Sequence, residues 1–260
     1  MQKPAHLGPE YGAQFRDASV VDAYRFRPPY PAEVFEILGR LVGAGPPVVL
    51  DAGCGNGDLA LGLLGIADRV DALDPSAAML AAGQARPGGD DPRLHWIAGT
   101  MEDAPLDGPY ALITTGESLH WMDWPVAMRR FRELLAPEGR LAIVNRTEQP
   151  NPWAAALQQL INQYSTNRDY QPYDLVHELT QRGLLHVVAS ELTEFRPFTQ
   201  SINDFIESIH SRNGFSRDRM TIEAAAAFDR AVQTLLQPYA VEDTVTLLIG
   251  GTVVSGLPTG

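Results

Sequence analysis

Hydrophobic positions along the chain form short apolar runs that alternate with helical stripes. Val48, Val49 and Leu50 make a run of strand-favouring residues, of the kind that is covered on both faces in a parallel sheet. Apolar residues at three- and four-residue spacing precede this run and follow it, and this spacing predicts helices. Further strands are predicted within 70–73, 94–98, 112–115, 141–144, 187–198 and 245–249. The alternation of strands and helices predicts an α/β fold with a doubly wound, mostly parallel sheet.

Three glycines come directly after the first predicted strand. Gly53, Gly55 and Gly57 follow Asp51 and carry no Cβ, so a ligand can approach the backbone N–H groups at the start of the next helix. Asp74 closes the second predicted strand, at the distance in sequence at which a carboxylate accepts from ribose hydroxyls. The spacing differs from the dinucleotide fingerprint, which favours a nucleoside cofactor without phosphate over a dinucleotide. A tight structural turn is the alternative.

Four stretches resemble the class I S-adenosylmethionine-dependent methyltransferases. Residues 50–57, Leu-Asp-Ala-Gly-Cys-Gly-Asn-Gly, resemble the first motif of that family, and 98–106 resembles its adenine-contacting turn. Residues 110–121 resemble the fourth strand and following loop of the small-molecule branch related to trans-aconitate methyltransferases, and 134–144 resembles the fifth strand with its preceding helix end. The resemblance implies a Rossmann-like sheet of seven strands, S-adenosyl-L-methionine as cofactor and a small-molecule substrate.

The resemblance also implies which residues contact the cofactor. Tyr24 and Arg27 match a segment that faces the methionyl carboxylate, for which an arginine fork is suited. Many of these enzymes place an aspartate where Thr100 stands, so the adenine contact falls to the Thr100 hydroxyl, the Met101 backbone or Glu102. The expected cofactor-binding residues are Tyr24, Arg27, Asp51, Ala52, Gly53, Gly55, Asp74, Pro75, Met79, Thr100, Met101, Glu102, Glu117 and Ser118.

The methyl acceptor is expected beside the loop that follows the fourth strand. Ligands of doubly wound sheets bind outside the carboxyl ends of the strands, which places 117–121 at the site. His120 is the candidate general base, because a neutral imidazole with a pKa of about 6.5 can take a proton near neutral pH. A histidine that only hydrogen-bonds a neighbouring loop is the alternative. The expected substrate-binding residues are Tyr30, His120, Trp121, Trp124 and His210.

The chain is expected to form a single methyltransferase domain over residues 1–260. Within it, residues 1–45 are expected to form an N-terminal arm and helix over the cofactor. The pattern becomes helical over residues 147–185, which are expected to form an insertion that closes over the substrate, as in similar methyltransferases. Tyr164, Tyr170 and Tyr173 in this insertion could grip a planar or apolar acceptor, or form the core of the lid.

The composition of the chain limits the classes of binding partner that we expect. A formal net charge of −12 disfavours nucleic acid, whose affinity for proteins depends on Lys and Arg at the phosphates. No apolar run approaches the ~20 residues of a membrane span, and no signal-peptide core is present, so a cytoplasmic protein without a membrane partner is expected. The single cysteine, Cys54, is expected to fill space between two glycines. No metal-ligand spacing is found, and a homodimer remains open.

The sequence alone is compatible with three functions. The first is methyl transfer to an oxygen, nitrogen or carbon atom of a small molecule, such as a carboxylate or a specialised metabolite, mainly by proximity and with His120 as a possible base. The second is a methyltransferase-fold enzyme that binds S-adenosylmethionine but catalyses another reaction, such as a cyclisation. The third is a non-catalytic partner protein that binds the cofactor.

Overall fold

The computed structural model describes residues 3–43 and 47–259; residues 1–2, 44–46 and 260, some of which belong to the expected 1–45 arm, lie outside the described residues. The strands are β1 Val48–Ala52, β2 Arg69–Asp74, β3 Leu94–Ala98, β4 Tyr110–Gly116, β5 Leu135–Glu148, β6 Leu185–Leu192, β7 Arg196–Ser201 and β8 Thr244–Pro258. Seven of them lie in the order β3-β2-β1-β4-β5-β8-β6, and β7 pairs with β8 outside this path. This order reverses between β1 and β4, which is the switch point where doubly wound sheets bind ligands.

The strands from β3 to β5 are parallel, and β8 runs antiparallel between β5 and β6. The expected fold class, a doubly wound and mostly parallel α/β sheet, is therefore confirmed. The stretch 187–198, expected as one strand, divides into β6 and β7, which pair with different parts of β8. The sheet thus has one strand more than the seven expected.

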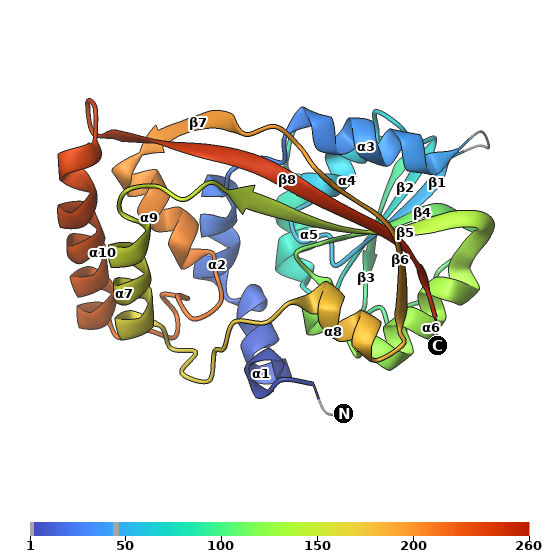
Figure 1. Cartoon of the computed structure of the whole chain (residues 1–260), viewed down its shortest axis with the longest axis horizontal. Coiled ribbons are helices and arrows are strands. Elements are labelled where there is room, and N and C mark those ends of the chain that lie inside the picture. Colours follow the sequence, from blue (N-terminus) through green and yellow to red (C-terminus); the bar gives the residue numbers. More distant parts are fainter. Residues whose placement is uncertain (1–2, 44–46, 260) are drawn as a thin grey trace.

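Strand β8 is longer than the sequence pattern predicts. The expected strand ended at Ile249, but β8 continues through Gly250 and Gly251 to Pro258. Its first part pairs with β7 and its second part lies between β5 and β6. A Cβ at Gly251 would overlap the side chain of Val34, so glycine lets a helix pack closely on this strand. Figure 1 shows β8 crossing the whole molecule and joining its two halves.

The α-helices are α1 Pro9–Gly12, α2 Ala18–Ala23, α3 Ala32–Val42, α4 Asp58–Leu63, α5 Ala77–Gln84, α6 Trp124–Leu134, α7 Ala154–Tyr164, α8 Leu175–Gln181, α9 Ile202–His210 and α10 Ile222–Leu236. Short 3₁₀ helices are η1 Ala5–Leu7, η2 Ala13–Arg16, η3 Tyr24–Phe26, η4 Leu119–Trp121 and η5 Gln237–Tyr239. Several α-helices begin at a capping side chain that accepts from a backbone N–H in the first turn. These caps are Ser76, Asp123, Asp174, Ser201 and Thr221.

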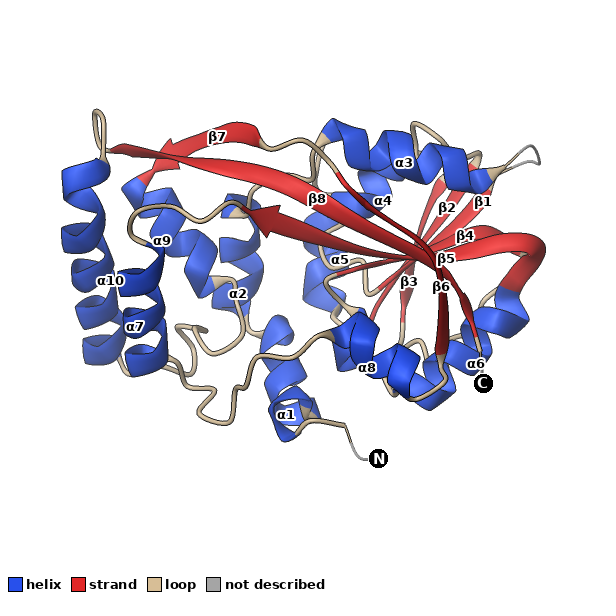
Figure 2. Ribbon diagram, in the orientation of Figure 1, coloured by secondary structure: helices blue, strands red, loops and turns tan. Residues whose placement is uncertain are grey.

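Helices cover both faces of the sheet (Figure 2). Successive strand residues point to opposite faces, so Val49 belongs to the core that includes α3 and α4, whereas Leu50 belongs to the core that includes α6. Leu112 and Ile113 on β4 divide in the same way. The near-continuous apolar runs of the sequence are explained by this burial on both sides.

A third hydrophobic core lies away from the central sheet. Helices α7, α9 and α10 pack around Phe205 and Phe228 and against β7 and the first part of β8. Figure 1 shows these helices at the left, with α2 beside them, and we refer to α7, α9, α10, β7 and the start of β8 as the helical lobe. The segment 147–185 is divided between two places, because α7 belongs to the lobe whereas Leu179 of α8 packs in a sheet core.

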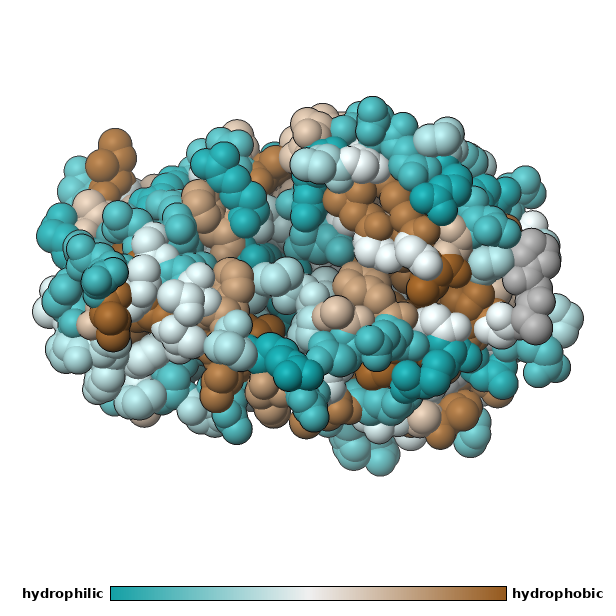
Figure 3. All heavy atoms as spheres, turned by 90° about the horizontal axis from the view of Figure 1, so that it is seen from above, coloured by the Kyte–Doolittle hydropathy of each residue, from teal (hydrophilic) through white to brown (hydrophobic). Residues whose placement is uncertain are grey.

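The molecular surface carries both apolar and hydrophilic residues. Seen from above, apolar residues are scattered among hydrophilic ones over the right-hand half of the molecule (Figure 3). Single exposed apolar residues, such as Val188 and Leu192 on β6, are usual on protein surfaces. Among the helices of the described residues, none has the length and apolar character needed to cross a bilayer.

Candidate active site

The turn after β1 and the end of β2 hold each other in place. The backbone N–H groups of Gly53 and Cys54 donate to the Leu73 carbonyl at 2.8 and 2.9 Å. The Gly55 N–H donates to Asp74 Oδ2 at 2.9 Å, and the Ser76 N–H donates to Asp74 Oδ1 at 2.8 Å. Burial raises the pKa of Asp74, and these two N–H donors oppose that rise. The Asp74 carboxylate is therefore fixed at the edge where the parallel strands end.

The loop after β4 approaches the same turn. Ser118 Oγ donates to the Ala52 carbonyl at 2.6 Å. A Cβ at Gly53 would overlap the Ser118 side chain, and Gly53 has φ 74°, a backbone conformation that favours glycine. The glycine at position 53 is thus required for the close approach of two loops as well as for the turn.

A cavity of about 470 Å³ opens over these loops, and we call it the glycine-turn cavity. Most residues expected at the cofactor line it, drawn from the ends of β1, β2, β3 and β4. Its lining includes Tyr24, Gly53, Gly55, Asp74, Pro75, Met79, Thr100, Met101, Glu102, Glu117, Ser118 and Trp121. Asp51, Ala52 and Arg27 are not part of this lining. Ala52 is buried and takes part through its carbonyl, which accepts from Ser118.

The N-terminal arm forms the other wall of the glycine-turn cavity. Pro9, Gly12, Ala13, Phe15 and Arg16 line it. The Phe15 carbonyl accepts from Ser76 Oγ at 3.1 Å, which ties the arm to the start of α5. The sequence does not predict a role for these five residues, because the first nineteen residues show no hydrophobic periodicity that would place them against the strands.

A second, larger cavity of about 820 Å³ adjoins the first, and we call it the arginine cavity. The two cavities share Phe15, Glu117 and Trp121 in their linings. One part of the wall is apolar or aromatic: His120, Trp121, Ile143, Tyr170, Tyr173, Leu175, Val176 and Ile249. The other part is polar: Arg27, Glu117, Asn145, Arg146, Thr147, Glu148, Asp174, Arg212 and Asn213. Such a combination suits a ligand with an apolar body and a polar group.

Glu117 carries the negative charge at the boundary of the two cavities. Its Oε2 lies 3.0 Å from Arg146 Nη1 and 3.5 Å from Arg27 Nη1, and its Oε1 accepts from the Arg146 N–H at 3.2 Å. Burial alone would raise the pKa of Glu117, but Arg146 and Arg27 outweigh it and lower that pKa. Glu117 is thus ionised. Arg146 lies in β5, just past the predicted fifth strand at 141–144, and the strand-end argument applied to the other strands could have found it.

Arg27 and Tyr24 are joined but face different cavities. Arg27 Nη1 donates to the Tyr24 hydroxyl at 3.1 Å, and its guanidinium lies 4.0 Å from the centre of the Tyr24 ring. Arg27 Nε and Nη2 donate to the hydroxyl and carbonyl oxygens of Ser211 at 2.8 and 2.7 Å. Arg27 therefore lines the arginine cavity, whereas Tyr24 lines the glycine-turn cavity. The expected contact of Arg27 with a cofactor carboxylate stays a prediction.

Asp51 and Tyr30 lie beneath the site. Burial raises the pKa of Asp51 to about 7, and the Thr114 hydroxyl donates to its Oδ1 at 2.9 Å. Tyr30 is buried, with the Arg146 guanidinium 3.9 Å from its ring centre. Both residues line only a small hollow of about 20 Å³ next to Gly53 and Tyr24. This placement corrects the expectation that Tyr30 lines the acceptor pocket, because the buried ring packs against the Arg146 guanidinium and is not part of the lining of the arginine cavity.

His120 and Trp121 both line the arginine cavity. Their rings lie 4.6 Å apart, and Trp121 also faces the glycine-turn cavity. Burial lowers the pKa of His120 to about 4, although Glu117 opposes this shift. The imidazole is thus uncharged near neutral pH. Within the part of the chain that the structure describes, neither ring nitrogen of His120 has a hydrogen-bond partner.

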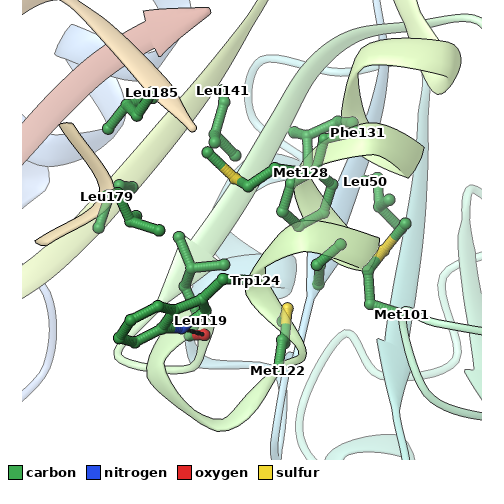
Figure 4. Packing of buried hydrophobic residues seen from close by; sticks show 14 of the residues in the cluster. Leu50, Met101, Leu119, Met122, Trp124, Met128, Phe131, Leu141, Leu179 and Leu185 are labelled. Carbon is green, nitrogen blue, oxygen red and sulfur yellow. Dashed lines mark hydrogen bonds between the residues drawn. The ribbon is translucent and has the colours of Figure 1, made fainter. Parts of the chain in front are cut away.

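Two residues expected at the substrate lie elsewhere. Trp124 is in a sheet core beside Leu119 and Leu179, and its Nε1–H donates to the Leu119 carbonyl at 3.0 Å (Figure 4). His210 is fully buried in the helical lobe, where Nδ1 and Nε2 lie 2.7 Å from the Phe215 carbonyl and Asp229 Oδ1. Neither residue lines either cavity. The assignments of Trp124 and His210 to the acceptor pocket are therefore wrong, because hydrophobic packing takes both rings inward.

Comparison with known proteins relates this chain to methyltransferases. A family described as "Methyltransferase domain" matches residues 49–139. An uncharacterized methyltransferase of Mycobacterium tuberculosis is 32% identical over 189 residues, which cover 66% of this chain and 74% of that protein. Methyltransferase pgmE of Aspergillus terreus is 30% identical over 139 residues, covering 52% of this chain and 38% of that protein.

Solved structures share the fold at low sequence identity. A protein from Anaeromyxobacter dehalogenans, provisionally described as a type II methyltransferase, superimposes with a TM-score of 0.61 at 21% identity, covering 88% of this chain and 96% of that one. The [4+2]-cyclase SpnF superimposes with a TM-score of 0.53 at 19% identity, covering 88% of this chain and 82% of that one.

The strand order, the glycine turn after β1 and the acidic end of β2 together define a class I, Rossmann-like methyltransferase fold. The chain belongs to the S-adenosylmethionine-dependent methyltransferases of this class, as its mycobacterial relative and the matched domain show. The family and cofactor that the motif resemblance implied are thereby confirmed.

Proposed function

We propose that this enzyme transfers a methyl group from S-adenosylmethionine, bound in the glycine-turn cavity, to a small molecule bound in the arginine cavity. The observation that carries the proposal is the shared boundary of the two cavities at Phe15, Glu117 and Trp121. Ligands in two adjoining cavities can meet there, and holding two reactants in contact supplies much of the catalysis for such a transfer.

The residues of the glycine-turn cavity fit the cofactor. Its volume of about 470 Å³ falls within the usual range of small-ligand pockets. Asp74 presents a fixed carboxylate of the kind that accepts from ribose hydroxyls, and the glycines leave the turn open to an adenosine. Met79 and Met101 line the cavity with apolar surface that suits an adenine ring. Thr100, Met101 and Glu102 remain the proposed contacts at the edge of that ring.

Methyl transfer needs little acid–base chemistry from the protein. S-adenosylmethionine, when bound, supplies a methyl group on a positively charged sulfur, which is already activated for attack. The residues at the boundary then orient the acceptor and exclude water. Phe15 and Trp121 lie with ring centroids 5.5 Å apart, which places apolar surface where the two cavities meet. Orientation of this kind can lower a barrier by roughly 7–11 kcal/mol.

His120 is the proposed proton acceptor if the methylated atom is a hydroxyl or an acidic carbon. Its unpaired ring nitrogens and its place in the cavity wall suit this role, but a pKa of about 4 makes it a weak base in the protein without ligands. The negative charge of Glu117 opposes this lowering of the His120 pKa, because it favours the protonated imidazole. An acceptor that is already anionic would need no base.

Two parts of the chain are proposed to cover the site. Residues 1–45 include the arm that walls the glycine-turn cavity, which supports a role over the cofactor. Tyr170, Tyr173 and Leu175, from the segment 147–185, line the arginine cavity, which supports a role of that segment over the acceptor. Arg212 and Asn213 extend this cover beyond the segment expected from the sequence.

The test combines binding with turnover. Calorimetry with S-adenosylhomocysteine should show binding, and incubation with methyl-labelled S-adenosylmethionine and a small-molecule extract should transfer label to a small molecule. Cofactor binding together with chemical change of an extract component but without label transfer would favour another reaction, such as a cyclisation. Binding without any turnover would favour a non-catalytic partner protein. Absence of cofactor binding would contradict the proposal itself.

A further inference from the structure

The arginine cavity contains a cation without a partner. Arg212 lines this cavity, and its guanidinium makes no hydrogen bond or ion pair with any residue that the structure describes. The other two arginines in the wall are occupied: Arg27 bonds to Ser211 and Tyr24, and Arg146 bonds to Glu117 and Asp58. Guanidinium groups turned toward a half-enclosed cavity usually have an acceptor, because an unpaired charge away from water is costly.

Hydrogen bonds fix the loop that carries Arg212. The Arg212 N–H donates to the Ile209 carbonyl at 2.9 Å, and the Gly214 N–H donates to Gln14 Oε1 at 2.9 Å. The Asn213 side chain donates to the Tyr11 carbonyl at 2.8 Å and accepts from Asn167 Nδ2 at 2.6 Å. The backbone is therefore preorganised, and the guanidinium is the part of the loop left available to a ligand.

The charges around Arg212 favour an anion. Burial lowers the pKa of Arg212, the nearby cation of Arg27 lowers it further, and Glu148 opposes the shift. Glu148 is not within ion-pair distance of Arg212, and its own Oε1 accepts from Asn151 at 2.6 Å. Glu117 is shared by Arg146 and Arg27. Glu148 and Glu117 oppose the shift from a distance, and neither forms an ion pair with Arg212.

We propose that the methyl acceptor is a small-molecule anion with an apolar body, and that Arg212 binds its anionic group. This inference rests on the proposed function, since it names the class of molecule that enters the arginine cavity. A carboxylate matches the fork of N–H donors that a guanidinium presents. Tyr170, Tyr173 and Ile249 provide the apolar surface for the remainder of the molecule.

The test uses a generic pair of probes, trans-cinnamate and trans-cinnamamide, which share an apolar body and differ in charge. Calorimetry first establishes that S-adenosylhomocysteine binds, and both probes are then titrated into the loaded protein. Cinnamate should bind at least about tenfold more tightly than cinnamamide, because charge-assisted hydrogen bonds are the stronger ones. Arg212→Gln should remove this preference and Arg212→Lys should retain part of it.

The control is Arg230→Gln, which removes one cation from the exposed face of α10 and should leave the preference unchanged. Equal affinities for the two probes, no measurable binding of either probe, or a preference that survives in Arg212→Gln would overturn the inference. Retained binding of S-adenosylhomocysteine in those cases would leave the proposed function standing, whereas its absence in the unaltered protein would remove the proposed function instead.

Discussion

Glu117 Oε2 and Arg146 Nη1 form an ion pair of 3.0 Å at the boundary between the two cavities. Glu117 comes from the loop after β4 and Arg146 from β5, so the pair ties together two neighbouring strands at their carboxyl ends. Their side chains are only 27% and 11% exposed, and Arg27 shares the same carboxylate. The pair therefore belongs to the framework that positions both ligands.

Glu117→Gln should destabilise the protein, because it leaves Arg146 and Arg27 without their shared anion. We expect a loss of about 1–3 kcal/mol in the free energy of unfolding, measured by urea denaturation. Glu191→Gln is the matched control, since Glu191 pairs with Arg40 at an exposed site and should cost less than about 1 kcal/mol. Equal losses of stability in the two variants would show that the ion pairs of Glu117 contribute no more to stability than an exposed ion pair does.

Gly53→Ala should abolish binding of S-adenosylhomocysteine and lower the melting temperature. The added methyl group would overlap Ser118 in addition to straining a backbone with φ 74°. Gly183→Ala separates these effects, because Gly183 has a similar φ of 67° but nothing within 4 Å of an added Cβ. We expect that control to lose roughly 1–2 kcal/mol of stability from strain alone and to keep its affinity. Equal affinity of the two variants would contradict this assignment.

Asp74→Asn should weaken binding of S-adenosylhomocysteine at least about tenfold, since a charged acceptor is exchanged for a neutral one with the same shape. Calorimetry measures the affinity, and circular dichroism checks that the fold is kept. Asp90→Asn, at an exposed turn, makes the same chemical change outside the cavity and should have no effect. An unchanged affinity in Asp74→Asn would mean that this carboxylate only holds the turn together.

Acid should destabilise the protein through His120. Its pKa is about 4 in the folded protein and about 6.5 when unfolded, so between these values the unfolded state binds more protons and stability falls as the pH falls. Asp51 acts in the opposite sense, because its folded pKa of about 7 means that stability contributed by its bound proton is lost as the pH rises from about 4 to 7. The wild-type profile therefore contains both effects.

The variant His120→Gln isolates the histidine contribution. Urea denaturation at pH 7.5 and pH 5 measures the change in the free energy of unfolding on acidification. That change should be more stabilising in His120→Gln than in the wild type, because the destabilising effect of the histidine is removed. In Asp51→Asn, where the opposing group is removed, the change should be more destabilising than in the wild type. The same change in His120→Gln as in the wild type would mean that the imidazole is not held in its neutral form by burial.

The sequence predicts the frame of this molecule well and its cavities only in part. Hydrophobic periodicity and short apolar runs predict the first five strands, because a strand that is buried on both faces is apolar along most of its length. The same reasoning ends the last strand at Ile249, whereas β8 continues through Gly250 and Gly251 to Pro258. The packing of Val34 against β8 explains why a glycine occurs at position 251 of that strand.

Side-chain direction is where the sequence is least informative. Trp121 and Trp124 are three residues apart in one aromatic stretch, yet Trp121 lines both cavities and Trp124 lies in the core. A turn of helix begins between them and rotates the second ring inward. Arg212 has no local signal at all, because its place in the cavity wall depends on how the helical lobe packs against the N-terminal arm.

The most direct measurement is a crystal structure with S-adenosylhomocysteine. The account predicts the adenosine in the glycine-turn cavity, with its ribose at Asp74 and its sulfur directed to the boundary formed by Phe15, Glu117 and Trp121. A ligand found in the arginine cavity instead, or a sulfur turned away from that boundary, would contradict the account, because the methyl group could not reach an acceptor beside His120.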